Sequence, residues 1–135
     1  MILIDHLDWA ENGEFQTRVT PLPTSCLATE SGIPNWAGLE YMAQSVAAYS
    51  GNMALSHSGK VKEGFLLGTR EVIFHCEAYP FYEELRIQGR VVVNSNEMGV
   101  FDCNILNPSN DVLANCKLNV FQPEDPRTFL KEASA

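Results

Sequence analysis

Glu40 is the residue with the clearest potential for chemistry, because it stands almost alone among apolar neighbours. Between Glu30 and Lys60 the sequence holds no other acidic or basic side chain except His57. A carboxylate in apolar surroundings is costly unless it is hydrogen-bonded or holds a proton, and a carboxyl group that exchanges its proton near neutral pH can act as a general acid or base. We therefore predict that Glu40 is catalytic. The alternative is that the helix dipole simply favours a glutamate near a helix N-terminus.

Gln44 and the loop before Glu40 complete a candidate site. Gln44 follows one helical turn after Glu40, and its amide can hold a carbonyl, a hydroxyl or a water together with the carboxylate. Residues 32–38 lead into the helix, so their free backbone N–H groups are expected to polarise a substrate carbonyl. Gly38 would let a substrate approach the backbone closely. Simple packing, with Pro34 at the start of the helix, explains the same loop without chemistry.

A long apolar helix must position these residues. Residues 36–55 carry apolar side chains at helical spacing and nearly all round, which predicts one buried helix. Asn12-Gly13 separates two alternating segments and predicts a hairpin. Further strands are predicted over residues 65–74, 85–93, 100–105 and 112–121. The expected fold class is α+β, with one antiparallel sheet curled around a central apolar helix.

Composition limits the other possibilities. A chain of 135 residues with 45% hydrophobic content suits one domain, predicted over residues 1–123 with a polar tail at 124–135. The net charge of -8 argues against binding to nucleic acid or to an anionic membrane. Residues 1–11 do not read as a signal peptide, and no apolar run is long enough to span a bilayer, so a cytoplasmic location is expected. The four cysteines form no C-x-x-C pair, so we expect neither a metal site nor a cofactor.

Residues 34–44 resemble the helix start P-G-x-x-x-x-E-x-x-A-Q of the hot-dog-fold 3-hydroxyacyl-[acyl-carrier-protein] dehydratases, with Pro34, Glu40, Ala43 and Gln44 at matching positions. Residues 36–44 and 64–70 are more similar to predicted dehydratases associated with aryl polyene biosynthesis. The resemblance implies a hot-dog fold, a 3-hydroxyacyl thioester on a carrier protein or coenzyme A as substrate, and Glu40 as the group that handles the hydroxyl. It also implies an acyl-chain site along the helix, to which we assign Trp36, Ala37, Gly38, Leu39, Gln44, Phe65 and Leu66.

One departure from this family concerns the catalytic base. Its members carry a histidine fourteen residues before the glutamate, and this chain has Cys26 there. A thiol is a poor base unless its surroundings lower its pKa. Three explanations stay open: a base from elsewhere, with His57 or His75 as donors; a mixed dimer in which a related hot-dog subunit supplies it; or thioester hydrolysis by a single glutamate. A non-catalytic module that binds acyl chains is a further alternative.

Three basic residues are concentrated within eleven positions of this acidic chain. Lys60, Lys62 and Arg70 could receive an acidic carrier protein or a coenzyme A phosphate, although a solvated loop is the simpler explanation. A small sheet wrapped on one helix leaves a long edge that must be covered. We therefore expect a homodimer, or a mixed dimer, in which two sheets join edge to edge.

Overall fold

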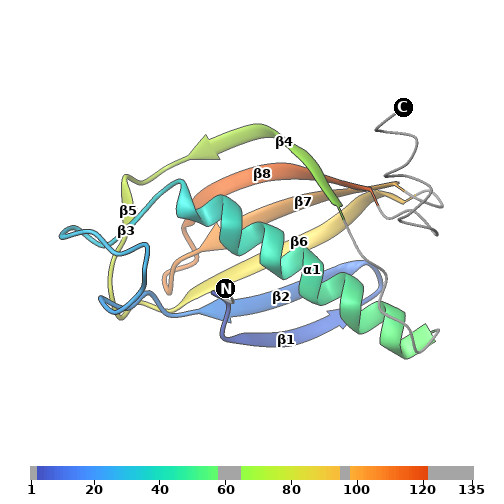
Figure 1. Cartoon of the computed structure of the whole chain (residues 1–135), viewed down its shortest axis with the longest axis horizontal. Coiled ribbons are helices and arrows are strands. Elements are labelled where there is room, and N and C mark those ends of the chain that lie inside the picture. The colour runs from blue at the N-terminus through green and yellow to red at the C-terminus, as the bar shows by residue number, and fades with distance from the viewer. Residues whose placement is uncertain (1–2, 58–64, 95–97, 122–135) are drawn as a thin grey trace.

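The computed structural model describes residues 3–57, 65–94 and 98–121 of the chain. These residues form one six-stranded antiparallel sheet, one long helix and one two-stranded ribbon (Figure 1). The sheet has the order β1-β2-β6-β7-β8-β4, and the ribbon pairs β3 with β5. The elements are β1 His6–Glu11, β2 Glu14–Val19, β3 Ile33–Pro34, α1 Ala37–His57, β4 Phe65–Phe74, β5 Ala78–Tyr79, β6 Leu85–Asn94, β7 Met98–Leu106 and β8 Val112–Phe121. The predicted tail at 124–135 lies outside the described residues.

The hairpin of β1 and β2 turns at the two residues that the sequence predicts. Asn12 and Gly13 have φ angles of 53° and 77°. Two consecutive positive φ angles are typical of a type I′ turn, whose twist matches that of the flanking strands. The predicted hairpin is therefore confirmed.

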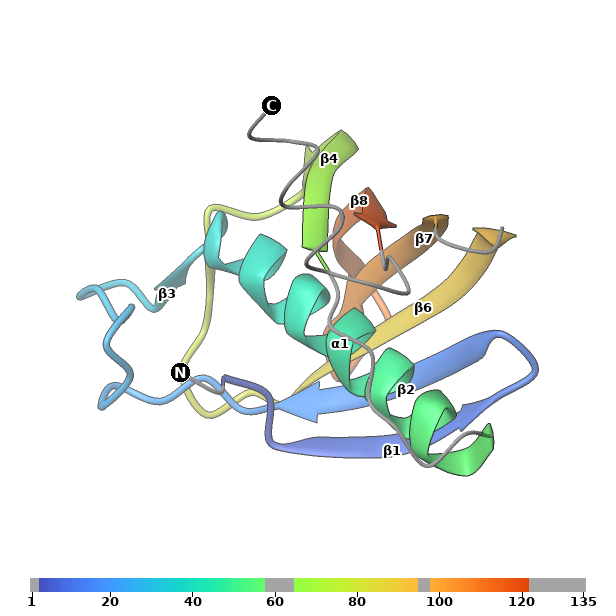
Figure 2. The ribbon, with the colours of Figure 1, turned by 45° about the vertical axis from the view of Figure 1, so that its right-hand side comes forward.

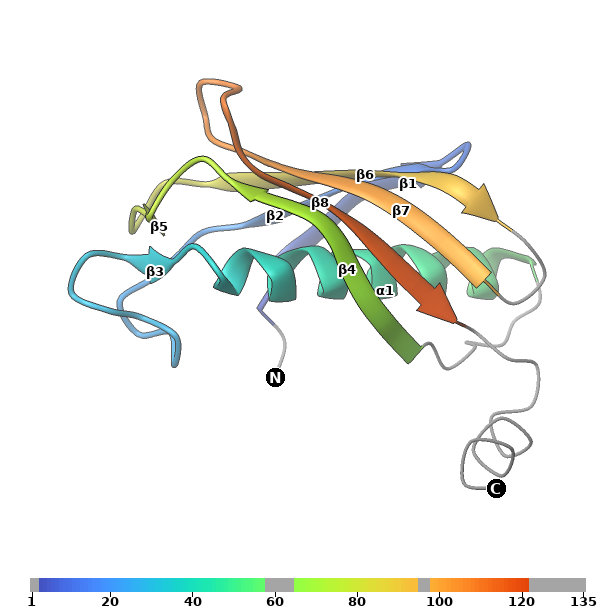
Figure 3. The same cartoon turned by 90° about the horizontal axis from the view of Figure 1, so that it is seen from above.

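The core lies between α1 and the concave face of the sheet (Figures 2 and 3). Side chains alternate along the strands, so every second residue faces the helix and is buried. The phenyl ring of Phe15 stacks on the ring of Tyr49 from α1, with 5.2 Å between ring centroids. The other inward residues include Val19, Leu85, Ile87, Phe101, Cys103, Ile105, Ala114, Cys116 and Leu118.

The helix is covered on one side only. Trp36, just before α1, is 55% exposed, and Glu40, Ala47 and Asn52 are exposed along the side that faces away from the sheet. The sequence predicts burial all round because the helix is apolar all round, but a single sheet contacts a single face. In the parts of the chain that the structure describes, no helix is both long and apolar enough to cross a membrane.

The two-stranded ribbon is not predicted by the sequence, which indicates only a long loop before the helix. Ile33 pairs with Tyr79, and Pro34 pairs with Ala78. Each strand has two residues, too short for a recognisable alternation. The ribbon ties the start of α1 to the segment between β4 and β6.

Candidate active site

The start of α1 is held by contacts from residues more than forty positions away. The backbone N–H of Asn35 donates to the Glu77 carbonyl at 3.0 Å, and its side-chain amide donates to the Cys76 carbonyl at 3.0 Å. The Tyr79 hydroxyl donates to the Asn35 carbonyl at 3.0 Å. These bonds hold Asn35 in place at the N-terminal end of α1. They therefore also set the direction in which the Glu40 side chain points from the helix.

Gly38 makes room for the chain itself. A Cβ atom at this position would collide with the Tyr79 hydroxyl and would lie 2.9 Å from Ile105 Cδ1. Ala37 and Gly38 are both buried. Tyr79 occupies the space beside the Gly38 backbone, where a close approach of the substrate is predicted. The backbone N–H groups of Gly38 and Leu39 donate to the carbonyls of Asn35 and Trp36 at 3.0 and 3.1 Å, so these two groups are not free donors.

Glu40 and Gln44 are joined, as their spacing predicts. Gln44 Nε2 donates to Glu40 Oε1 at 3.2 Å, and Gln44 Oε1 accepts a hydrogen bond from the Leu3 backbone N–H at 2.6 Å. The N-terminal segment therefore orients the amide, and the amide orients the carboxylate. Glu40 lies on the open side of α1, where a substrate or a second subunit can reach it.

Next to this pair, the structure shows a hollow of about 250 Å³ that sequence reasoning did not find. Its lining includes Leu3, Asp5, Ser25, Cys26 and Tyr41. Cys26 and Tyr41, the residue that follows Glu40, therefore line the same hollow, and Leu3 belongs both to the hollow and to the contact with Gln44.

Tyr41 is the polar group of this hollow that is most enclosed, with 2% of its surface exposed. Burial, and to a lesser extent the negative charge of Asp5, raises the pKa of Tyr41 to about 12. Its hydroxyl therefore keeps its proton at neutral pH and can donate a hydrogen bond, but it cannot act as a base. Tyr41 could have been found from the sequence as a residue of the site, because it directly follows Glu40 at the start of the helix.

The structure places one of the two candidate histidines, His57, far from Glu40 within one chain. His57 ends α1, seventeen residues after Glu40, which places it about 25 Å along the helix axis. His75 is exposed beyond the end of β4, where its backbone N–H donates to the Leu113 carbonyl at 2.9 Å. This chain alone therefore does not supply the missing base through His57.

The remaining predicted residues fall in different places. Trp36 lies just before α1 and is exposed, and Leu39 lies in its first turn and is half-buried. Phe65 and Leu66 pair with Phe121 and Val120 through the backbone of β4, and their side chains lie outside the described part. Lys60 and Lys62 also lie outside it.

Arg70 lies on the side of the sheet that faces away from α1. It is exposed, pairs with Lys117 across β4 and β8, and donates to Asn119 Oδ1 at 3.2 Å. Lys117 faces away from α1, because both its neighbours, Cys116 and Leu118, are buried under the helix. The role of Arg70 in carrier binding stays a prediction. Within the described residues, no cluster of three His, Cys, Asp or Glu side chains could hold a metal ion.

Comparison with known proteins supports this assignment of fold. A chain of the dehydratase heterocomplex ApeI:P from Xenorhabdus doucetiae is similar with a TM-score of 0.86 and 22% identity, over 99% of this chain and 90% of that one. The protein smu.793 from Streptococcus mutans UA159, solved with acetyl CoA, has a TM-score of 0.70 and 16% identity, over 89% and 88%. The PaaI protein of Escherichia coli has a TM-score of 0.69 and 12% identity, over 89% and 79%. The predicted hot-dog fold is confirmed.

The sequence comparison identifies the family. None of the curated proteins matches the chain. The family described as ApeP-like, ApeP dehydratase, matches residues 1–131, nearly the whole sequence. The chain therefore belongs to the ApeP-like dehydratases.

Proposed function

We propose that this chain dehydrates 3-hydroxyacyl thioesters held on a carrier protein, as one half of a mixed dimer with a related hot-dog subunit. The observation that carries the proposal is the position of Glu40, which is oriented by Gln44 on the open side of α1 and lies about 25 Å along the helix axis from His57. A subunit packed on this side would cover the carboxylate and could supply a base. The similar solved chain belongs to a dehydratase heterocomplex, which supports a mixed dimer.

The reaction needs an acid and a base on one substrate. A histidine of the second subunit would remove the proton from C2, next to the thioester carbonyl. Glu40 would give its proton to the hydroxyl on C3, so that the C3–O bond breaks, water leaves and the C2–C3 double bond forms. Cover by the second subunit would exclude bulk water from the reacting groups. Gln44 would keep the carboxyl group in place throughout.

The test is turnover of a 3-hydroxyacyl carrier protein by the complex isolated from the native source, measured as the loss of one water by mass spectrometry. Glu40→Gln keeps the size of the side chain but removes the titrating group, so turnover should fall about 10²- to 10⁴-fold while the unfolding midpoint stays unchanged. Glu83→Gln, at an exposed position between β5 and β6, is the matched control. Full turnover by Glu40→Gln would exclude Glu40 as the acid.

Hydrolysis of the thioester is the second candidate, because the exposed carboxylate of Glu40 could also activate a water molecule. The same assay separates the two reactions, since hydrolysis releases a free acid and a free thiol, whereas dehydration leaves the acyl chain attached. Binding of the acyl carrier protein without either product would identify a non-catalytic module. A cytoplasmic location and a domain that ends near residue 123 remain predictions.

A further inference from the structure

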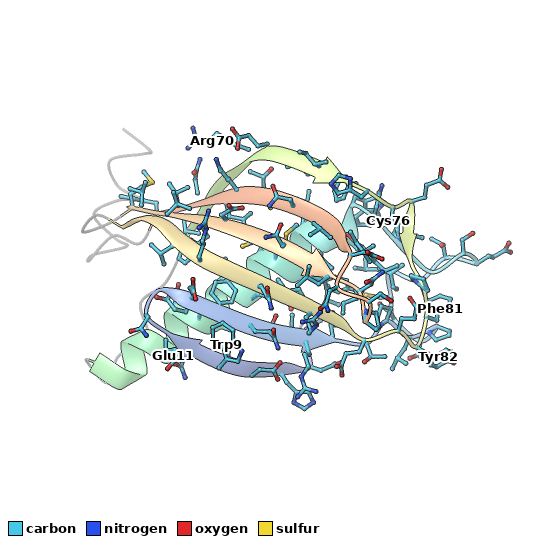
Figure 4. All side chains as sticks on the ribbon, turned by 180° about the vertical axis from the view of Figure 1, so that it is seen from behind. Trp9, Glu11, Arg70, Cys76, Phe81 and Tyr82 are labelled. Atoms are coloured by element: carbon cyan, nitrogen blue, oxygen red, sulfur yellow. The ribbon has the colours of Figure 1, made fainter. Side chains whose placement is uncertain are left out.

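The convex face of the sheet, turned away from α1, carries an ordered row of charges. Direct cross-strand partners point to the same side of a sheet, so successive pairings define a row across all six strands. Starting at β1 and ending at β4, the row reads Glu11, Glu14, Arg90, Asp102, Lys117 and Arg70. Its charges are therefore negative, negative, positive, negative, positive and positive. Figure 4 shows its two ends, Glu11 and Arg70, at opposite edges of the sheet.

This order is complementary to itself. A two-fold axis that runs parallel to the strands, between β6 and β7, exchanges β1 with β4, β2 with β8 and β6 with β7. Each residue of the row then faces a residue of opposite charge in a second copy. Arg90 faces Asp102 of the partner subunit, Glu14 faces the partner's Lys117, and Glu11 faces the partner's Arg70.

The neighbouring row shows the same symmetry in its chemistry. From β1 to β4 it reads Trp9, Gln16, Gln88, Asn104, Asn115 and Ile73. The same axis brings amide to amide at all four inner strands, and it brings Trp9 against the partner's Ile73. These two outer side chains are 41% and 50% exposed in the single chain. On a third row, Val93 pairs with Val100 and is itself 50% exposed, so the axis places valine against valine.

The charge balance of this face also favours a second copy. The chain has 9 basic and 17 acidic residues, so two copies repel each other over most of their surfaces. The convex side of the strands is different, because it holds five basic residues, Arg18, Arg70, Arg86, Arg90 and Lys117, and five acidic ones, Asp8, Glu11, Glu14, Glu71 and Asp102. The charges of the strand residues on this side therefore balance, whereas the chain as a whole is acidic.

The charged side chains of this face can still contact a second copy, although some of them form ion pairs within the chain. Arg90 Nη2 lies 3.5 Å from Asp102 Oδ2, and the Arg90 side chain is 65% exposed. Lys117 Nζ lies 2.8 Å from Glu71 Oε2 at the surface. Arg90 and Asp102 of two copies would form an alternating cluster of four charges. A hollow of about 180 Å³, lined by Trp9, Glu14, Gln88 and Arg90 among others, lies where the partner's Lys117 would reach.

We infer that two copies of this chain associate through the convex faces of their sheets, back to back, around this two-fold axis. Packed sheets lie about 10 Å apart, and two convex faces curve away from each other, so the inner strands make the contact while the outer charges act over longer range. Such an interface leaves α1, Glu40 and both edge strands free. It is therefore independent of the subunit that we propose at the active site.

The experiment uses Glu14 and Lys117, which lie three strands apart, about 14 Å, and cannot meet within one chain. Sedimentation of the purified full chain over a concentration series should show a reversible doubling of mass. Glu14→Arg and Lys117→Glu should each raise Kd for this step by about tenfold or more, because each places like charges together twice in a symmetric interface. An equimolar mixture of the two variants should recover the wild-type Kd, and so should the double variant.

The control is Glu83→Arg, which changes charge by the same amount at an exposed site outside the strands and should leave Kd unchanged. Circular dichroism checks that each variant is folded. Any one of the following results would overturn the inference: a wild type that never doubles in mass up to several hundred micromolar, a Glu14→Arg variant that doubles like the wild type, or folded variants whose mixture does not recover association. Capture of a different protein by a wild-type face that does not self-associate would also overturn it.

Discussion

The backbone N–H of Leu3 donates a 2.6 Å hydrogen bond to Gln44 Oε1, across forty-one positions of sequence. Because the amide oxygen is engaged in this way, its nitrogen points to Glu40. The first described residue of the chain thus helps to set the geometry of the candidate acid. This relationship makes Gln44 a positioning residue rather than a substrate contact alone.

Replacing Gln44 should therefore affect stability and turnover separately. Gln44→Met removes both hydrogen bonds and should cost about 1 kcal/mol of unfolding free energy. Gln44→Glu keeps an acceptor for Leu3 but places a second carboxylate one turn from Glu40, so it should retain more stability and still lower turnover. Denaturant unfolding and the dehydration assay measure the two effects. If Gln44→Met is as stable as the wild type, the tie to Leu3 contributes nothing.

Cys26 stands where the family has a histidine, and it lines the hollow beside Tyr41. Cys26→His should raise dehydration by the chain alone by about tenfold or more, because it restores a base near the start of α1. Cys26→Ser is the control and should change nothing. The gain should disappear in the double variant with Glu40→Gln, and a gain that persists there would show that the two residues do not act together.

Gly38 and Tyr79 should be coupled energetically. Gly38→Ala forces a Cβ into the Tyr79 hydroxyl and should destabilise the fold by about 1–3 kcal/mol. In the Tyr79→Phe background the penalty should shrink, since the nearest atom is absent, although Tyr79→Phe alone loses its bond to Asn35. Gly68→Ala has open space around it and serves as the control. Equal penalties in the two backgrounds would contradict this explanation.

Tyr41 should make the fold less stable at high pH. Its pKa of about 12 in the folded chain lies above the ordinary value of 10.0, so the folded state holds the phenolic proton more tightly than the unfolded state does. Its contribution, about 2–3 kcal/mol, is complete below about pH 10 and is lost as pH rises through about 12. Unfolding titrations at about pH 8 and about pH 11 should therefore differ less for Tyr41→Phe than for the wild type. An identical pH dependence would refute the assignment.

The sequence by itself determined the helix, the six strands of the main sheet and their order along the chain. The Asn12-Gly13 turn, the four later strands and the helix over residues 36–55 all rest on local periodicity and turn chemistry, and each has its counterpart in the structure. The contact between Glu40 and Gln44 also follows from local geometry, since residues four apart share a face of a helix.

Only the tertiary structure decided which distant segments meet. The pairing of β4 with β8, the ribbon that sets Tyr79 beneath Gly38, and the tie from Leu3 to Gln44 all join residues far apart in sequence. A local window of sequence carries no information about such partners, because their pairing depends on which faces remain to be buried after the chain collapses. The open side of α1 has the same origin: its composition specifies an apolar surface all round, while one sheet can cover only one side.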